Sequence, residues 1–282
     1  MKKLILNFCV ASILLLTIFS CNTSQQKPAE KNEKLRIVSL APSITREIVD
    51  LGLKNNIVGA TSYCEITKTI KELVIGTATE VNIEKVILLK PDIVVTTALT
   101  EPNIIESLRK NGINVYLVSK MHSFGEICSH FKELGKLLDR EAVADSIIAV
   151  SVKKIDSLKS IIPAGTKKKK VFFQIGANPI FTVIPNTFMN DLITMSGCEN
   201  IASGFTKGTI TRESVLQRNP DVIFVVTMGI LGEDETKAWQ SYKDMSATKN
   251  SKIFVVDSDM ACTPTVLSFT RTFEQVVTNI YF

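Results

Sequence analysis

The sequence has few of the residues that build metal sites. It contains two histidines, His122 and His130, and its six cysteines show no pair at metal-ligand spacing. Imidazole is the usual protein ligand of zinc and manganese, so a histidine-rich carrier of such ions is disfavoured. We interpret both histidines as helix-surface residues or as residues between the two lobes.

Motifs that carry enzyme chemistry are also missing. The chain has no Gly-x-Gly-x-x-Gly fingerprint, no phosphate loop ending in Gly-Lys-Ser/Thr, no Gly-x-Ser-x-Gly elbow and no His-Glu-x-x-His. The formal net charge is only +5, and basic residues are scattered among acidic ones, which argues against a nucleic-acid footprint. We therefore expect no enzyme, no catalytic residues, no cofactor of its own and no nucleic-acid partner.

The first 34 residues have the pattern of an export signal followed by a tether. Two lysines precede an apolar run over residues 4–19 that is too short for a comfortable membrane span. Residues 1–20 resemble a bacterial lipoprotein signal, which implies lipidation of Cys21; an ordinary signal or a membrane anchor with a chance cysteine is the alternative. Residues 21–34 are polar and predict a disordered tether. We expect an exported protein, lipid-anchored on the periplasmic side of the cell membrane.

One stretch of the chain occurs twice. Residues 84–97 read Glu-Lys-Val-Ile-Leu-Leu-Lys-Pro-Asp-Ile-Val-Val-Thr-Thr, and residues 213–226 repeat the Glu, Val, Pro and Asp in the same register. Each copy predicts a short helix that ends before the proline, because the residue before proline avoids the α region. The continuous apolar run that follows is typical of a parallel strand covered on both faces. Two copies predict two similar lobes.

Strand and helix patterns alternate in both halves of the chain. We predict an N-terminal α/β lobe over residues 35–121, a connecting helix over 122–162 and a C-terminal α/β lobe over 163–282. The piece of the connection over 140–161 would be about 33 Å long at 1.5 Å per residue. The predicted fold is two doubly wound, Rossmann-like lobes joined by one long α-helix, with a ligand cleft between them at the carboxyl ends of the strands.

Local signals predict smaller features. Ser43 is expected to cap the first helix, residues 176–181 to form the exit loop of a strand, and residues 199–201 to form a turn. Trp239 is either a wall of the cleft or the anchor of a surface helix. Pairing of two cysteines within the second lobe stays open, although we expect most to be small buried residues. The four concerned are Cys64, Cys128, Cys198 and Cys262.

Several motifs, taken in their order and spacing, resemble those of one family. They are residues 37–43, Tyr63-Cys64, Glu84 with residues 89–92, residues 173–179, residues 197–201 and Asn219-Pro220-Asp221. Together they resemble a substrate-binding protein of an ABC importer, in the helical-backbone class that binds cobalamin, haem and ferric siderophores. The resemblance covers Leu35 to Tyr281.

The resemblance implies a monomeric receptor that captures a corrinoid or an iron chelate and delivers it to an inner-membrane permease and its ATPase. Any cobalt or iron would then belong to the ligand. A haem- or ferric-siderophore-specific receptor is the alternative within the family. An enzyme or metallocluster protein built on the same lobes is the alternative of another class, because fold does not determine function.

The resemblance also implies a ligand site. Tyr63 is expected to line the cleft, as the corresponding tyrosine does in cobalamin-binding relatives; the alternative is a ring packed beneath its own loop. The other expected contacts are Ala41, Pro42, Ser43, Thr45, Thr97, Asn178, Phe181, Lys207 and Thr263. Tryptophans of the cobalamin-binding relatives are replaced here by Ala78, Thr97 and Lys207, and the metal-ligating tyrosine of haem-binding relatives by Thr77. The identity of the ligand stays open.

The two repeat copies imply a second site. In the family that this chain resembles, paired glutamates engage arginines of a two-fold permease, and Glu84 and Glu213 occupy the corresponding positions. The local alternative is a stabilising carboxylate in a helix's first turn, after the capping residues Asn82 and Thr211.

Overall fold

A computed structural model of the protein describes residues 34–282 except 78, 166 and 228–231. The predicted signal peptide, the lipidation site Cys21, nearly all of the tether and Ala78 therefore lie outside the described residues. Leu35–Phe282 forms one compact unit that contains two sheets. We call the part built on the first sheet the first lobe and the part built on the second sheet the second lobe. The predicted boundaries of these lobes stay predictions.

The first lobe is built on a parallel four-stranded sheet of order β2-β1-β3-β4. Alternate residues of its central strands point to opposite faces, so Val38 and Val94 pack in one core while Ile37 and Val95 pack in another. Both faces are thus buried, as expected for a parallel sheet. The elements are β1 (Ile37–Ser39), α2 (Pro42–Asp50), β2 (Ile57–Ala60), α3 (Glu65–Thr69), α4 (Ile83–Leu88), β3 (Ile93–Thr97), α5 (Pro102–Lys110) and β4 (Val115–Val118), with short 3-10 turns at Lys54–Asn56 and Lys71–Leu73.

The second lobe has a sheet of order β6-β5-β8-β9, with β7 also paired to β5. Its pairs are parallel except for β5 with β6, and every residue of β8 is buried. The elements are β5 (Lys170–Ala177), β6 (Ile180–Thr182), α8 (Phe188–Thr194), β7 (Glu199–Asn200), α9 (Arg212–Arg218), β8 (Val222–Val226), α10 (Gly232–Gln240), α11 (Ser246–Lys249), β9 (Ile253–Val256) and α12 (Ser258–Ala261).

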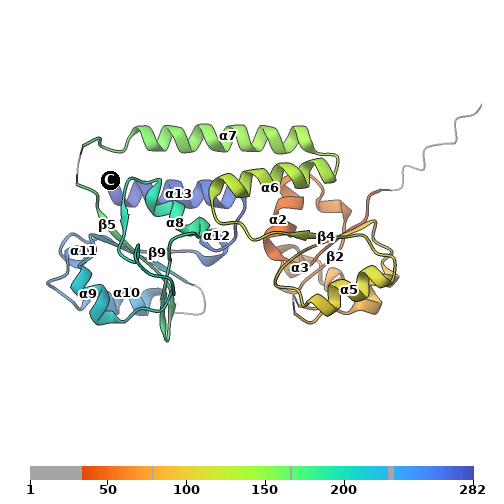
Figure 1. The fold of residues 1–282 in the computed structure, drawn as a ribbon, viewed down its shortest axis with the longest axis horizontal. Coiled ribbons are helices and arrows are strands. Elements are labelled where there is room, and N and C mark those ends of the chain that lie inside the picture. The colour runs from red at the N-terminus through yellow and green to blue at the C-terminus, as the bar shows by residue number, and fades with distance from the viewer. Residues whose placement is uncertain (1–33, 78, 166, 228–231) are drawn as a thin grey trace, which may run out of the picture. The chain divides into compact units, whose positions relative to one another are not determined.

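Three helices form a layer along one side of both lobes: α6 (Phe124–Leu137), α7 (Glu141–Ser160) and α13 (Val266–Tyr281). Figure 1 shows α7 running above α6 and α13. Its 20 residues span about 30 Å at 1.5 Å per residue. Gly135 allows α6 and α7 to approach closely, because a Cβ there would lie 2.6 Å from the Cβ of Ala144. The predicted long helical connection is therefore present.

The start of α6 also binds the second lobe directly. The backbone N–H of Phe124 donates to the Asp191 carboxylate (2.9 Å), and its ring stacks on Phe269 of α13. The Nδ1 atom of His122 lies 2.8 Å from the carbonyl oxygen of Asn186, which can only accept, so this nitrogen carries the hydrogen. These contacts join the end of the first lobe to the second.

The sequence repeat is also a structural repeat. The first copy forms α4 and β3, and the second forms α9 and β8. Each repeated strand pairs in parallel with the first strand of its lobe. The residue before each proline is left-handed, with φ of 44° at Lys90 and 46° at Asn219. The two lobes therefore share one plan at this point.

Three local predictions are wrong. Ala41, not Ser43, is the N-cap of α2, which begins at Pro42; proline suits this first position because it lacks the N–H that would stay unpaired there. Residues 176–181 are not only a loop, since Ala177 of β5 pairs with Ile180 of β6. Glu199–Asn200 is a short strand and not a turn.

Trp239 is the anchor of a surface helix and not a wall of a cleft. It is fully buried under α10, and its Nε1 donates to Gln174 (2.6 Å). Its ring meets Phe172 edge to face. The four cysteines of the described chain are all free: Cys64 and Cys198 are buried, and Cys128 and Cys262 are half-buried.

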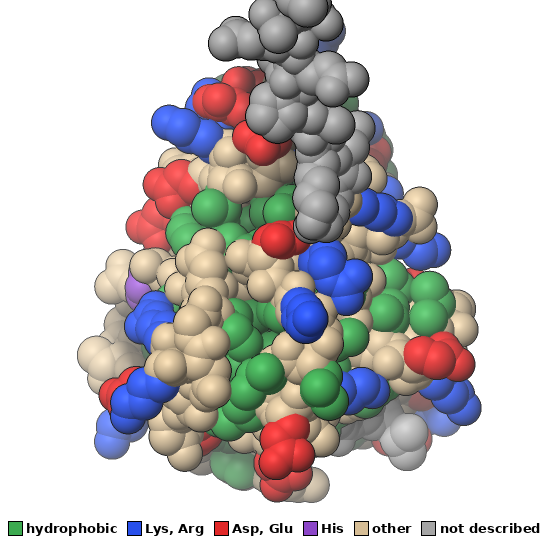
Figure 2. All heavy atoms as spheres, turned by 90° about the vertical axis from the view of Figure 1, so that its right-hand side faces the viewer, with side chains coloured by type: hydrophobic (Ala, Val, Ile, Leu, Met, Phe, Trp, Pro, Cys, Tyr) green, Lys and Arg blue, Asp and Glu red, His purple; other side chains and the backbone are tan. Residues whose placement is uncertain are grey.

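The surface carries mixed charge. Figure 2 shows basic and acidic side chains interspersed around apolar ones on the end of the molecule that it faces. Among helices of the described residues, none is both long and apolar enough to span a membrane.

Candidate functional site

A cavity of about 320 Å³ lies between the two lobes. Most of its wall comes from α2 and from the segment that contains α3, and the remainder comes from the region around α12 in the second lobe. The lining residues are Pro42, Thr45, Arg46, Val49, Lys54, Tyr63, Glu65, Ile66, Lys68, Thr69, Asp259 and Thr263. The cavity therefore extends along α2 from its first residue, Pro42, at the carboxyl end of β1, which is the end of the strands where open parallel sheets bind ligands.

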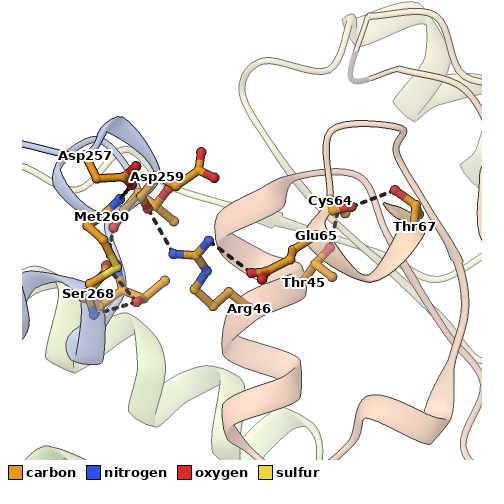
Figure 3. Close-up of polar contacts among 11 residues, drawn as sticks. Thr45, Arg46, Cys64, Glu65, Thr67, Asp257, Asp259, Met260 and Ser268 are labelled. Carbon is orange, nitrogen blue, oxygen red and sulfur yellow. Dashed lines mark hydrogen bonds and ion pairs between the residues drawn. The ribbon is translucent and has the colours of Figure 1, made fainter. Parts of the chain in front are cut away.

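Tyr63 projects from a firmly held loop. Its side chain is 70% exposed, so the ring is not packed beneath its own loop. The next residue, Cys64, is fully buried, and its Sγ lies 3.0 Å from the Thr45 hydroxyl and 3.1 Å from that of Thr61. The Thr67 hydroxyl donates to the Cys64 carbonyl oxygen (2.6 Å). Burial of Cys64 thus holds the loop while Tyr63 stays free to contact a ligand (Figure 3 shows Cys64 with Thr45 and Thr67).

Arg46 links the two lobes at the cavity wall. Its Nη1 donates to the backbone carbonyl oxygen of Asp259 in the second lobe (2.9 Å), and its Nη2 lies 3.5 Å from a carboxylate oxygen of Glu65 (Figure 3). The guanidinium is held from both sides of the cavity, although the 3.5 Å contact with exposed Glu65 is a weak one. Arg46 is therefore placed to respond to a ligand that bridges the lobes.

The charge of the lining is mixed with a small basic excess. Arg46, Lys54 and Lys68 are cationic, whereas Glu65 and Asp259 are anionic. Behind the lining, burial raises the pKa of Asp50, and the nearby charges of Arg46 and Arg271 oppose this rise. The arrangement can hold a ligand that carries acidic groups.

A buried ionisable pair supports α2 from behind. Glu47 is fully buried, and its Oε2 lies 2.9 Å from Nε2 of His130 on α6. The other carboxyl oxygen, Oε1, is buried and has no hydrogen-bond partner. Burial raises the pKa of Glu47, while the hydrogen bond and charge of His130 lower it. His130 is therefore neither a helix-surface residue nor a contact between the lobes, but a buried contact between α6 and α2 of the first lobe.

The structure brings four of the predicted contacts together at the cavity: Pro42, Thr45, Tyr63 and Thr263. The other predicted contacts do not line it. Ala41 is buried beneath it, and Ser43 lies in the first turn of α2. Thr97 ends β3, Asn178 and Phe181 belong to the β5–β6 hairpin, and Lys207 is exposed on the second lobe.

Sequence reasoning missed eight lining residues: Arg46, Val49, Lys54, Glu65, Ile66, Lys68, Thr69 and Asp259. Helical periodicity could have indicated Arg46 and Val49, which lie one turn after Pro42 and Thr45. No local pattern marks Asp259, because a contact across the lobes depends on tertiary structure. Thr77, where the resemblance implied the metal-ligating tyrosine of haem-binding relatives, accepts a hydrogen bond from the Glu80 N–H within its own turn.

Glu84 and Glu213 occupy the same position in their helices. Each is the second residue of its helix, behind a capping side chain: Asn82 accepts from the Lys85 N–H and Thr211 from the Ser214 N–H. Both glutamates are exposed, and neither forms an ion pair with another residue in the described part of the chain. Hydrogen bonds from its own backbone N–H and from Thr211 lower the pKa of Glu213. Both are therefore free to meet a partner.

Metal-binding side chains do not cluster in this structure. Across residues 34–282, leaving aside the few positions that are not described, no three His, Cys, Asp or Glu side chains come together in a way that could hold a metal ion.

Comparison with known proteins gives consistent relatives. The family model for periplasmic binding proteins matches residues 37–260. An uncharacterized ABC transporter substrate-binding lipoprotein of Bacillus subtilis is 29% identical over 246 residues, covering 85% of this chain and 78% of the relative. A vitamin B12-binding protein of Vibrio campbellii is 25% identical over 255 residues, covering 88% of each chain.

Solved structures share the fold. A possible iron-binding periplasmic solute-binding protein of Staphylococcus epidermidis aligns with a TM-score of 0.75 and 27% identity, covering 88% of this chain and 98% of that one. A periplasmic haem-binding protein of Vibrio cholerae aligns with a TM-score of 0.77 and 20% identity, covering 88% and 100%.

Proposed function

Because the chain belongs to the periplasmic binding protein family, we propose that it captures a corrinoid or an iron chelate between its lobes and delivers it to an ABC permease. The family is one of binding and transport proteins and not of enzymes. The observation that carries the proposal is the interlobe cavity, which is lined by the exposed Tyr63 and the partly buried Arg46 and completed by the second lobe.

The charge of this cavity favours an iron chelate or haem among these ligands. Three cations and two carboxylates line it, and two of the cations, Lys54 and Lys68, are exposed. Carboxylate groups, such as those of haem or of many siderophores, would pair with these cations. A corrinoid that presents mostly neutral amides would gain less from them. The relatives named for vitamin B12 keep the corrinoid as the second candidate.

A thermal-shift screen tests the ligand class. Cobalamin, cobinamide, haem and several ferric siderophores are added in turn, since a ligand that binds only the folded protein raises its melting temperature. Calorimetry then compares the wild type with Tyr63→Ala, for which we expect a loss of about 1 to 2 kcal/mol, typical of an aromatic contact. Phe282→Ala removes an exposed aromatic ring outside the cavity and serves as the control. Unchanged affinity in Tyr63→Ala, with a lower melting temperature, would contradict the proposed site.

The proposal includes docking through Glu84 and Glu213. Their recurrence at one helix position in both lobes supports it. A carboxylate in the first turn stabilises its own helix by only about 0.3 to 1 kcal/mol, and this effect does not require the same position in both helices. Replacing both by Gln should preserve ligand affinity and melting temperature while abolishing ligand-dependent uptake and stimulation of the transporter's ATPase. Full transport by the double variant would leave helix capping as their whole role.

The proposal also includes a lipid anchor at Cys21, which rests on the sequence alone. We expect the wild type to incorporate labelled fatty acid and to fractionate with the membrane, and Cys21→Ala to incorporate no label. A wild-type protein that stays in the membrane fraction without label would identify an uncleaved apolar anchor instead.

A further inference from the structure

Leu88 exposes an unusually large apolar surface at the end of α4. Its side chain is 80% exposed, and that of the preceding Ile87 is 36% exposed, whereas Val86 is fully buried. Successive residues of a helix point about 100° apart, so this six-residue helix cannot turn all three side chains toward the core. The structure buries Val86 and leaves Ile87 and Leu88 outward.

The exposed leucine shares its helix face with Glu84. Residues four apart on a helix are neighbours on its surface, as are residues three apart, so Glu84, Ile87 and Leu88 form one patch. We call these three residues the α4 patch. The neighbouring cation Lys85 is turned elsewhere, since its Nζ donates to the carbonyl oxygen of Val74 (2.7 Å). The patch therefore combines an unpaired carboxylate with an apolar surface.

The second copy of the repeat lacks this apolar surface. Glu213 corresponds to Glu84, but Leu88 is replaced by Gln217, and Leu216 at the position of Ile87 is partly buried against the second-lobe core. The glutamate thus recurs and the exposed leucine does not. If the repeated helix needed an exposed leucine in order to fold, both copies would have one. Folding of the helix therefore does not account for Leu88.

We propose that the α4 patch is the principal binding contact for the permease, with Leu88 supplying affinity and Glu84 orientation. This inference rests on the proposed docking role of Glu84. Exposed ion pairs contribute little affinity, because the charges lose water and are screened by salt. Burial of a leucine side chain contributes about tenfold or more. The partner surface would present an apolar side chain or shallow pocket beside an arginine or lysine.

The charge of the patch selects this partner over two others. A second copy of the same chain, docked patch to patch, would bring two unpaired glutamates together. An anionic membrane surface would repel Glu84. A permease surface with a cation beside an apolar contact satisfies both parts of the patch.

The test measures binding of ligand-free receptor to its permease–ATPase complex in lipid nanodiscs by surface plasmon resonance. We expect Leu88→Gln, which installs the residue of the second copy, to weaken binding about tenfold. Gln217→Ala changes the matching position of the second lobe, and Val150→Gln changes another exposed apolar residue (67% exposed) on α7. Both should bind as the wild type does. Melting temperature and cavity-ligand affinity should be unchanged in all three variants.

Wild-type affinity in Leu88→Gln together with impaired Glu84→Gln would overturn the inference and leave the docking proposal standing. If neither variant were impaired, the docking proposal itself would fail. Sedimentation that shows dimers of the wild type but not of Leu88→Gln would assign the patch to a second copy, which also overturns the inference.

Discussion

Asp92 and Asp221 make the same pair of hydrogen bonds in the two lobes. The Asp92 carboxylate accepts from the backbone N–H of Arg36 (2.7 Å), and its own N–H donates to the Arg36 carbonyl oxygen (2.9 Å). The Asp221 carboxylate accepts from the N–H of Lys170 (2.8 Å), and its N–H donates to that residue's carbonyl oxygen (2.8 Å). Each repeated aspartate thus ties its turn to the start of the lobe's first strand, so the fold explains this part of the repeat.

We expect Asp92→Ala and Asp221→Ala to destabilise the protein unequally. Hydrogen bonds to a charged acceptor contribute about 1.5 to 3 kcal/mol when partly buried, and less when exposed. Asp221 also accepts from the Ser246 hydroxyl (2.9 Å), whereas Asp92 is exposed. Urea denaturation should show a loss of about 2 kcal/mol for Asp221→Ala and about 1 kcal/mol for Asp92→Ala. Asp244→Ala, at a fully exposed aspartate, is the control, and equal losses in all three would contradict this account.

Much of the fold follows from local patterns in the sequence. The strand Val115–Val118 begins and ends where its apolar run does, Ile93–Thr97 begins where its own run does, and α5 begins at its proline. The two strands are predictable because burial on both faces of a parallel sheet requires continuous apolar residues. The repeat likewise predicted two lobes, since each copy contains a complete helix and strand.

The cavity could be predicted only in part. Tyr63 and Thr45 lie there as the family resemblance implied, but Arg46 and Asp259 are 213 positions apart and meet only in the folded chain. Strand β7 was not predicted because its two residues are too few to show an alternating apolar pattern. They form a strand because they pair with β5. The burial of Glu47 beside His130 was not predicted, because the sequence of a helix does not show which other helix packs against it.

Little movement between the lobes is expected when a ligand binds. One long helix, α7, connects them, α13 packs against both α6 and α7, and Arg46 is hydrogen-bonded to the Asp259 carbonyl oxygen across the lobes. Small-angle scattering curves with and without ligand should therefore superimpose. A clear decrease in the radius of gyration would indicate hinge closure and contradict this expectation.

The half-buried thiols of Cys128 and Cys262 should react slowly with alkylating reagents. Burial raises the pKa of each thiol to about 11, and for Cys262 the charges of Asp257 and Asp259 add to the rise. Only the thiolate reacts, so native labelling by iodoacetamide near neutral pH should be roughly a hundredfold slower than labelling in urea. Peptide mass spectrometry measures each site. The native rate should rise about tenfold per pH unit up to the raised pKa, and rapid labelling at neutral pH would be the contrary result.

The Glu47–His130 pair predicts a specific dependence of stability on pH. Burial is the main cause of the raised pKa of Glu47, the negative charge of Asp50 adds to it, and His130 opposes it. Arg46 and Arg271 lie near Asp50, and their positive charges oppose the rise in its pKa. The folded protein holds the Glu47 proton more tightly than the unfolded chain. Its contribution to stability is therefore fully present below the ordinary pKa of 4.5 and is lost as the pH rises through the raised value.

Glu47→Gln removes this dependence, because the amide is uncharged at every pH and has nearly the same shape. A neutral amide costs less to bury than a carboxylate with one unpaired oxygen, and leaving such a group unpaired costs about 1 to 3 kcal/mol. We expect the variant to gain free energy of unfolding, relative to the wild type, as the pH rises from about 4 to about 8, reaching about 1 kcal/mol or more. Urea denaturation across this range measures the difference, and Glu106→Gln, at an exposed glutamate on α5, should show no such trend. A difference that stays constant with pH would mean that Glu47 does not titrate in this range. The pair lies behind the helix that presents Thr45 and Arg46 to the cavity, so ligand affinity measured on the same samples will show whether its protonation also affects binding.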